Sequence, residues 1–177
     1  MGIFNFFKKD KPESVVDFTV NDLKKGFILD YFLKTWEVKN VYVYDWGNNS
    51  FSREYFLDSG DESLYLYVED DDELICSIWS KIDILDISPS LIEIINSTDE
   101  APNSISYNSA TFVKISSNLG HCMEEGDEEA YDELINWTYQ NSDNKELISI
   151  DRVGEEEFEV AHGNYVQEFE FSNILPR

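Results

Sequence analysis

Carboxylates are the side chains of this sequence that could most readily do chemistry, because they bind metal ions and transfer protons. The chain has 37 Asp and Glu among its 177 residues. A calcium loop needs alternating Asp or Asn ligands, a Gly at its sixth position and a Glu at its twelfth. The acidic runs 58–62 and 70–73 lack that spacing. We therefore interpret both runs as solvated turns and predict no metal site.

Thiol and imidazole side chains offer a second chemistry. The Cys and His residues are Cys76, Cys122, His121 and His162. Adjacent residues of a strand point to opposite faces, so His121 and Cys122 are poorly placed to share a zinc ion. Cys122 and His162 could form a nucleophile pair only if the fold brought them together. The sequence also has no Gly-rich phosphate-binding loop, and we predict neither a catalytic residue nor a cofactor.

Glu69 and Asp151 stand apart from the other acidic residues because each ends a segment with the composition of a strand. Arg152 follows Asp151 in a chain that has few Arg residues. Two interpretations are open for these three residues. They could form a polar site between two parts of the molecule, or a salt bridge that locks those parts together. We favour the salt bridge.

Aromatic residues supply the candidate partner contacts. Phe4 and Phe7 lie in an amphipathic, basic tip, residues 1–11, which could weakly touch a membrane surface or enter a groove of a partner. A tail that folds back onto the core is the simpler interpretation. Trp46 precedes a Gly-Asn-Asn turn, where it could be an exposed anchor for a partner or a core residue.

The segments that must position these residues are short and rich in Val, Ile, Tyr, Phe and Trp, which is typical of strands. Hairpin turns are expected at Asn48-Asn49 and Ser59-Gly60. A short helix is expected near 89–96, and another with an acidic face over 123–135. The predicted strands of the first half are 28–38, 41–46, 51–57, 64–69 and 74–79.

The second half of the sequence resembles the first, because similar strand and turn segments recur in the same order. The aligned pairs are Tyr31 with Tyr107, Thr35 with Thr111, Trp36 with Phe112, Tyr55 with Trp137, Leu66 with Ile148, Val68 with Ile150 and Glu69 with Asp151. We predict a mainly β (β-rich α+β) fold of two tandem β-meander or partly open barrel-like repeats with two or three short helices. Its parts are the N-terminal tip (1–14), a first β unit (15–97) and a second, related β unit packed on the first (98–177).

Residues of both halves resemble an uncharacterised bacterial family, a domain of unknown function. The resemblance covers residues 15–175 and rests on Trp36, the run Tyr44-Asp45-Trp46-Gly47-Asn48-Asn49, Glu54-Tyr55, Leu66, Val68-Glu69, Ile148, Ile150 and Asp151-Arg152. Family members usually have Glu where this chain has Asp151, a change that keeps the charge. The resemblance implies an acidic, β-rich cytoplasmic protein, with a stress-related or membrane-associated setting. It supplies no established activity.

The charge balance limits the classes of partner. A formal net charge of −24 at pH 7 repels phosphate backbones and anionic membranes, so nucleic acid is not an expected partner. A basic protein, a polyamine or divalent ions would be attracted, although the simpler interpretation is that so broad a charge keeps the protein soluble. The first residues lack the pattern of a secretion signal, and no apolar run reaches the length of a membrane helix, so we expect a cytoplasmic protein.

Three functional hypotheses follow. The leading one is a non-catalytic acidic binding or adaptor module with a protein partner. The second is an acidic decoy or immunity-type inhibitor that covers a basic protein. The third is an uncharacterised enzyme, which would need a polar cluster in a real pocket.

Overall fold

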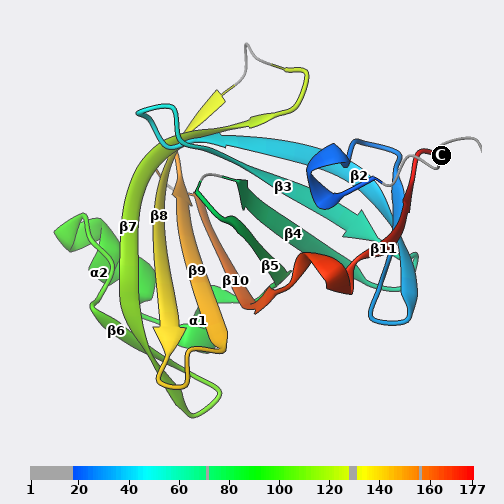
Figure 1. Ribbon diagram of the computed structural model, residues 1–177. Coiled ribbons are helices and arrows are strands. Elements are labelled where there is room, and N and C mark those ends of the chain that lie inside the picture. Colours follow the sequence, from blue (N-terminus) through cyan, green and yellow to red (C-terminus); the bar gives the residue numbers. More distant parts are fainter. Residues whose placement is uncertain (1–17, 71, 128–130, 156) are drawn as a thin grey trace, which may run out of the picture.

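Two consecutive antiparallel meanders make up most of the protein (Figure 1). The computed structural model describes residues 18–70, 72–127, 131–155 and 157–177. The first meander is β1 (Ile28–Tyr31), β2 (Lys34–Asp45), β3 (Phe51–Asp58), β4 (Ser63–Asp70) and β5 (Leu74–Lys81). The second is β6 (Ser104–Tyr107), β7 (Ala110–Glu124), β8 (Tyr131–Asn141), β9 (Glu146–Val153) and β10 (Glu157–Val166). The predicted mainly β class is confirmed.

The remaining elements are short. Helices α1 (Ile84–Ile87) and α2 (Leu91–Thr98) connect the meanders, 3-10 helix η1 (Val20–Asp22) precedes them, and 3-10 helix η2 (Glu168–Glu170) and strand β11 (Ser172–Leu175) follow them. Within the described ranges, no helix has the length and apolar composition needed to cross a bilayer.

Strand pairing joins the two meanders into one sheet that closes on itself. The sheet order is β11-β1-β2-β3-β4-β5-β10-β9-β8-β7-β6, and β2 also pairs with β7. Strands β2 to β5 and β7 to β10 therefore form a closed ring, with two seams between the meanders. At one seam Trp79 of β5 pairs with Gly163 of β10. At the other, Tyr44 of β2 pairs with Cys122 of β7.

The apolar core lies in two clusters on the outer face of this ring. On β4, Leu66 and Val68 enter the first cluster, whereas Tyr67 and Glu69 point into the ring, because successive side chains of a strand alternate between faces. The first cluster is covered by η1, β1 and β11, and the second by α1, α2 and β6. Figure 1 shows these covering elements on opposite sides of the ring. The interior of the ring is thereby left to polar and aromatic side chains.

The structure corrects two of the predicted elements and confirms others. The predicted strand 28–38 is broken by a two-residue turn between β1 and β2, and β2 then continues to Asp45 without the expected interruption. The helix predicted over 123–135 is wrong for the described residues of that range, because β7 continues to Glu124, which pairs with Tyr42 across the seam, and Tyr131 begins β8. Helix α2 confirms the helix expected near 89–96.

The turn between β1 and β2 is formed by two residues that are poorly suited to it. Phe32 and Leu33 have φ angles of 48° and 65°, and their exposed fractions are 83% and 105%. Two-residue hairpin turns of this kind require positive φ at both central positions, which Asn and Gly tolerate and large side chains do not. The β6–β7 turn has the same backbone, with φ angles of 47° and 66°, but uses Asn108 and Ser109.

Replacing Phe32 with Asn and Leu33 with Gly is expected to raise the free energy of unfolding by about 2 kcal/mol, because the left-handed conformation costs a large side chain roughly 1 kcal/mol or more. Urea denaturation of the double variant measures this. The matched change Ser109→Gly should have a smaller effect, since Asn108 already suits its position. An unchanged or lower stability in the double variant would show that Phe32 and Leu33 stabilise the fold.

Candidate functional site

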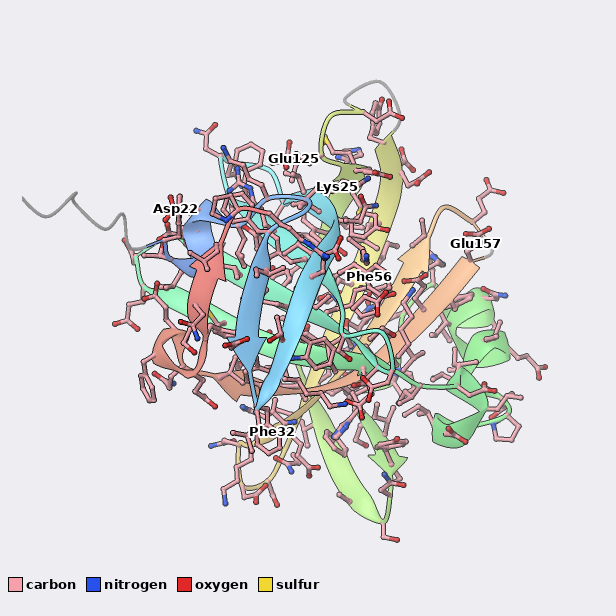
Figure 2. The ribbon with its side chains drawn as sticks, turned by 90° about the vertical axis from the view of Figure 1, so that its right-hand side faces the viewer. Asp22, Lys25, Phe32, Phe56, Glu125 and Glu157 are labelled. Atoms are coloured by element: carbon pink, nitrogen blue, oxygen red, sulfur yellow. The ribbon has the colours of Figure 1, made fainter. Side chains whose placement is uncertain are left out.

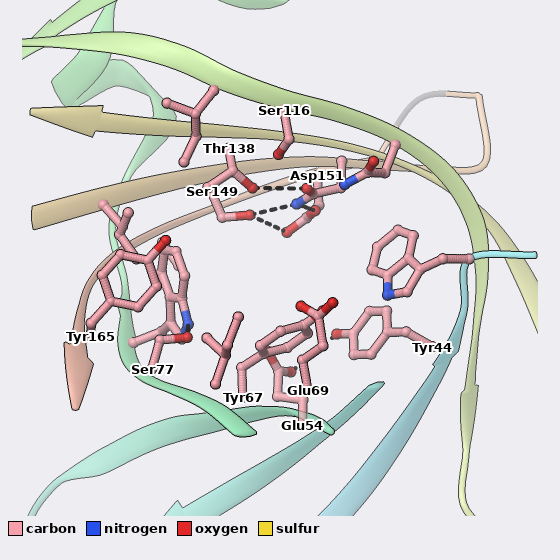
Figure 3. Close-up of a pocket in the computed structure, with 18 of the residues that line it drawn as sticks. Tyr44, Glu54, Tyr67, Glu69, Ser77, Ser116, Thr138, Ser149, Asp151 and Tyr165 are labelled. Atoms are coloured by element: carbon pink, nitrogen blue, oxygen red, sulfur yellow. Dashed lines mark hydrogen bonds between the residues drawn. The ribbon is translucent and has the colours of Figure 1, made fainter. Parts of the chain in front are cut away.

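A cavity of about 300 Å³ lies inside the ring (Figure 3). Each of the eight ring strands contributes at least one side chain to its lining. The strands place these side chains by simple alternation, so that Ser149 and Asp151 of β9 face the cavity while Ile148 and Ile150 between and beside them join the second apolar cluster. The cavity is therefore a consequence of ring closure.

Carboxylates enter the cavity from opposite walls. Figure 3 shows Glu54 and Glu69 on the side formed by β3 and β4, and Asp151 on the side formed by β9. Glu54 accepts a hydrogen bond from the Tyr44 hydroxyl at 3.2 Å. Asp151 accepts hydrogen bonds from Asn136 Nδ2 at 2.7 Å and from Ser149 Oγ at 3.1 Å. Two carboxylates from different meanders thus share one enclosed space.

The enclosure changes the acidity of both groups. Burial raises the pKa of Glu54 to about 8, and the negative charge of Asp151 contributes to the same shift. Burial also raises the pKa of Asp151 to about 6, although its hydrogen bonds from Asn136 and Ser149 oppose the shift. At neutral pH, Glu54 therefore holds a proton for most of the time while Asp151 is ionised.

Aromatic rings form much of the remaining wall. Tyr44 and Trp46 stack with their ring centroids 5.5 Å apart and an interplanar angle of 7°. The indole of Trp46 donates a hydrogen bond to Ser52 Oγ at 2.8 Å, and that of Trp79 donates to Ser77 Oγ at 2.7 Å. Because the N–H group of each indole donates a hydrogen bond to a serine, each ring faces the cavity in one orientation.

A glycine opposite each indole makes this arrangement possible. A Cβ on Gly163 would lie 2.5 Å from Cδ2 of Trp79, and a Cβ on Gly120 would lie 2.7 Å from Cε3 of Trp46. Gly163 is at the β5–β10 seam and Gly120 is beside the β2–β7 seam. Each Trp therefore lies against the strand of the other meander.

The fold brings together only some of the residues singled out from the sequence. Glu69 and Asp151 line the same cavity. Arg152 points to the other face of β9, where its NH2 lies 2.7 Å from Asp99 Oδ1 and its guanidinium lies 6.0 Å from the ring centroid of Trp137. The ion pair of Arg152 thus ties β9 to the end of α2. Trp46 is half-buried against the cavity, and Phe4 and Phe7 lie outside the described residues.

The fold does not bring Cys122 and His162 together as a nucleophile pair. Cys122 is on β7 and His162 on β10, with β8 and β9 between them in the sheet. Burial raises the pKa of the Cys122 thiol to about 12, which disfavours the reactive thiolate. His162 Nε2 instead lies 3.2 Å from Glu146 Oε1. For the part of the chain that the structure describes, no three His, Cys, Asp or Glu side chains converge in a way that could hold a metal ion.

Sequence reasoning missed Glu54, Tyr44 and Trp79 as members of one site. In a strand whose apolar and polar residues alternate, a carboxylate usually faces solvent, and for this reason Glu54 was not identified from the sequence. A signal was available in the alternating positions of the first meander, because Tyr44 and Tyr67 show that its polar face also carries aromatic residues.

Comparison with known proteins places the chain in a family. Residues 24–168 match the family model described as "Domain of unknown function (DUF4178)". The chain belongs to the DUF4178 family. It is also 26% identical over 184 residues to an uncharacterized protein of Aquifex aeolicus (strain VF5), an alignment that covers 99% of this chain and 95% of the relative. No solved structure gives a significant match. The resemblance to an uncharacterised family is confirmed.

Proposed function

We propose that this DUF4178 protein is a non-catalytic binding module that acts in the bacterial cytoplasm and holds a small ligand inside the strand ring. The observation that carries the proposal is the cavity of about 300 Å³, whose lining combines carboxylates with aromatic rings. This volume is at the lower end of the roughly 300–1,000 Å³ typical of ligand sites. The interior of a ring of this size can otherwise be filled completely by side chains.

The distribution of apolar residues supports a ligand rather than a structural role for the interior. Two apolar clusters outside the ring supply the core, so the fold does not depend on the cavity for burial. Glu54 and Asp151 accept hydrogen bonds from neighbouring side chains but form no ion pair among the described residues, so enclosing them still costs free energy. Functional sites commonly lower the stability of the fold that carries them, so a cavity with this cost is consistent with a binding role.

One observation favours a second candidate, an acid–base enzyme. Glu54, with a pKa of about 8, carries a proton at neutral pH, whereas Asp151, with a pKa of about 6, is ionised. Pairs of carboxylates with separated pKa values serve as acid and base in hydrolases. The acidic decoy role rests on the net charge, whereas a protein partner and an adaptor role rest on the aromatic candidates Phe4, Phe7 and Trp46 and on the lack of a catalytic motif in the sequence; all of these stay predictions.

Incubation with the small-molecule fraction of a bacterial extract, followed by ultrafiltration and mass spectrometry, tests the proposal. We expect the wild-type protein to retain at least one small compound and the Ala161→Phe variant to retain none of it, because Ala161 lines the cavity and a phenyl ring would fill it. Val113→Phe, on the exposed surface of β7, is the matched control and should behave as wild type.

Three results are distinguishable. A compound recovered unchanged from wild type and Val113→Phe alone supports the binding module. A compound converted to a product supports the acid–base enzyme. Equal retention by Ala161→Phe, with circular dichroism showing that this variant is folded, would refute a site in the cavity.

A further inference from the structure

The carboxylates of the cavity have no cationic partner among the described residues. The ion pairs of the described chain all involve other carboxylates, and neither Glu54 nor Asp151 takes part in one. Lys81 is the nearby cation that lowers the pKa of both groups, but its ammonium is held by Glu159 at 2.7 Å. The protein thus encloses two acidic groups without enclosing a positive charge against them.

The aromatic walls are an independent feature of the same space. Tyr44, Trp46, Tyr67 and Trp79 all line the cavity. The faces of Trp and Tyr rings attract cations within about 6 Å of the ring centre, and this attraction is strongest where water is displaced. Rings of this kind also pack against the alkyl part of an amine, which a bare ion does not have.

We propose that the cavity binds a small organic cation, with its ammonium group between Glu54 and Asp151 and its carbon chain against Trp46 and Trp79. This inference rests on the proposed binding function and specifies the chemical class of its ligand. The N–H donors of a primary ammonium match the carboxylate oxygens, which only accept hydrogen bonds. The net charge of −24 would attract such a ligand from solution.

A metal ion fits this cavity less well. Divalent cations prefer six or more oxygen ligands, or several waters that complete their coordination shell. Here the two facing carboxylates come from opposite walls, with indole and phenol rings around them, and the described residues contain no three-ligand cluster. Glu69 lines the cavity but does not complete such a cluster.

The cavity also has an opening to solvent. Ile75, Ile115 and Tyr165 belong to its lining and are 41%, 51% and 45% exposed. They mark the side on which the cavity meets solvent. An apolar rim at the mouth and carboxylates deeper inside suit a ligand with a charged head and a carbon tail.

The test is a titration of the full chain with n-butylammonium, 1-butanol and butyrate, which have similar size and different charge. Calorimetry gives the affinity, and the indole N–H signals of Trp46 and Trp79 in NMR spectra give the location. We expect n-butylammonium to bind at least about tenfold more tightly than 1-butanol, and butyrate not to bind. Glu54→Gln and Asp151→Asn should each weaken n-butylammonium binding about tenfold or more. Glu157→Gln removes an exposed carboxylate far from the cavity lining (Figure 2) and should change the affinity less than about twofold.

The number of protons released on ligand binding is a second measurement, and it would not change if Glu54 had only a structural role. An ammonium beside Glu54 favours its ionised form, so binding at pH 7 should release a proton from the wild-type protein and none from Glu54→Gln. Calorimetry in two buffers with different heats of ionisation measures this. The other titratable groups that interact electrostatically with Glu54 are all retained in the Glu54→Gln variant; they are Tyr44, Tyr65, Tyr67, Lys81, Cys122, Asp151 and Glu159.

The outcomes separate this inference from the binding function on which it rests. If 1-butanol or butyrate shifts the two indole signals as strongly as n-butylammonium does, the cavity binds ligands but does not select cations, and the inference is wrong. Tighter binding of Mg²⁺ or Ca²⁺ than of n-butylammonium would also overturn it. If no probe binds, the cation proposal fails, and the extract experiment with Ala161→Phe decides the proposed function by itself.

Discussion

Replacing Gly163 with alanine is expected to lower the free energy of unfolding by about 2–3 kcal/mol, because the new methyl group has no space at the β5–β10 seam. Its Cβ would lie 2.5 Å from Cδ2 and Cε3 of Trp79 and 2.7 Å from the carbonyl oxygen of Ile78. The indole can move only toward the cavity, which costs its hydrogen bond to Ser77. The backbone of Ile78 cannot move without disturbing the pairing that closes the ring.

A double-mutant cycle identifies the cause of this loss. If the clash with the indole dominates, Gly163→Ala should lower the free energy of unfolding much less in a Trp79→Ala background than in the wild-type protein. The loss that remains in that background measures the clash with the backbone of Ile78. Gly60→Ala is the control, because Gly60 has open space around its Cα and a φ angle of 92°, so any cost there comes from the backbone alone. Equal costs of Gly163→Ala in both backgrounds would show that Trp79 is not the obstacle.

The stability of the wild-type protein is expected to fall by on the order of 3 kcal/mol between pH 5 and pH 9 because of Glu54. Its pKa is about 8 in the folded protein, against an ordinary value of 4.5. The folded state therefore binds this proton more tightly than the unfolded chain, and the contribution to stability is present below pH 4.5 and is lost as the pH rises through 8. Asp151, with a pKa raised from 3.8 to about 6, adds a loss at lower pH.

The Glu54→Gln variant isolates this effect. Glutamine keeps the size of the side chain and an acceptor for the Tyr44 hydroxyl but does not titrate. Urea denaturation at several pH values should show that the variant loses less stability than wild type between pH 6 and pH 9 and is the more stable protein at pH 9. Because repulsion among the many surface carboxylates also grows with pH, Glu157→Gln serves as the control and should parallel wild type. Parallel curves for Glu54→Gln and wild type would show that Glu54 is not buried as a neutral acid.

The strands were largely predictable from the sequence, because the alternation of apolar and polar residues and the high content of β-branched and aromatic residues are typical of strands. β3, β4 and β5 lie within a residue or two of their predicted ranges. The turn at Phe32 and Leu33 was not predictable, since neither residue favours positive φ. The false helix over 123–135 had a related cause: its acidic composition favours an exposed helix, whereas Met123 is held in a strand by pairing with Val43 from the other meander.

Part of the candidate site was predictable from the sequence. Alignment of the two halves singled out Glu69 and Asp151, and both line the cavity. Glu54 was hidden because the charge of a side chain does not reveal which face of a strand is enclosed. That face is fixed only when the β2–β7 and β5–β10 seams close the ring, and both seams join residues that are distant in the sequence.

The two seams also determine the order in which the molecule can assemble. Within each meander, neighbouring strands are joined by short turns and can pair soon after they meet, whereas each seam must bring together residues roughly 80 positions apart. Folding rates fall as contacts become more distant along the chain. Closing the ring is therefore expected to be the slow, late step of folding. The enclosed space, and the raised proton affinity of Glu54 that depends on it, would come into existence only in that step.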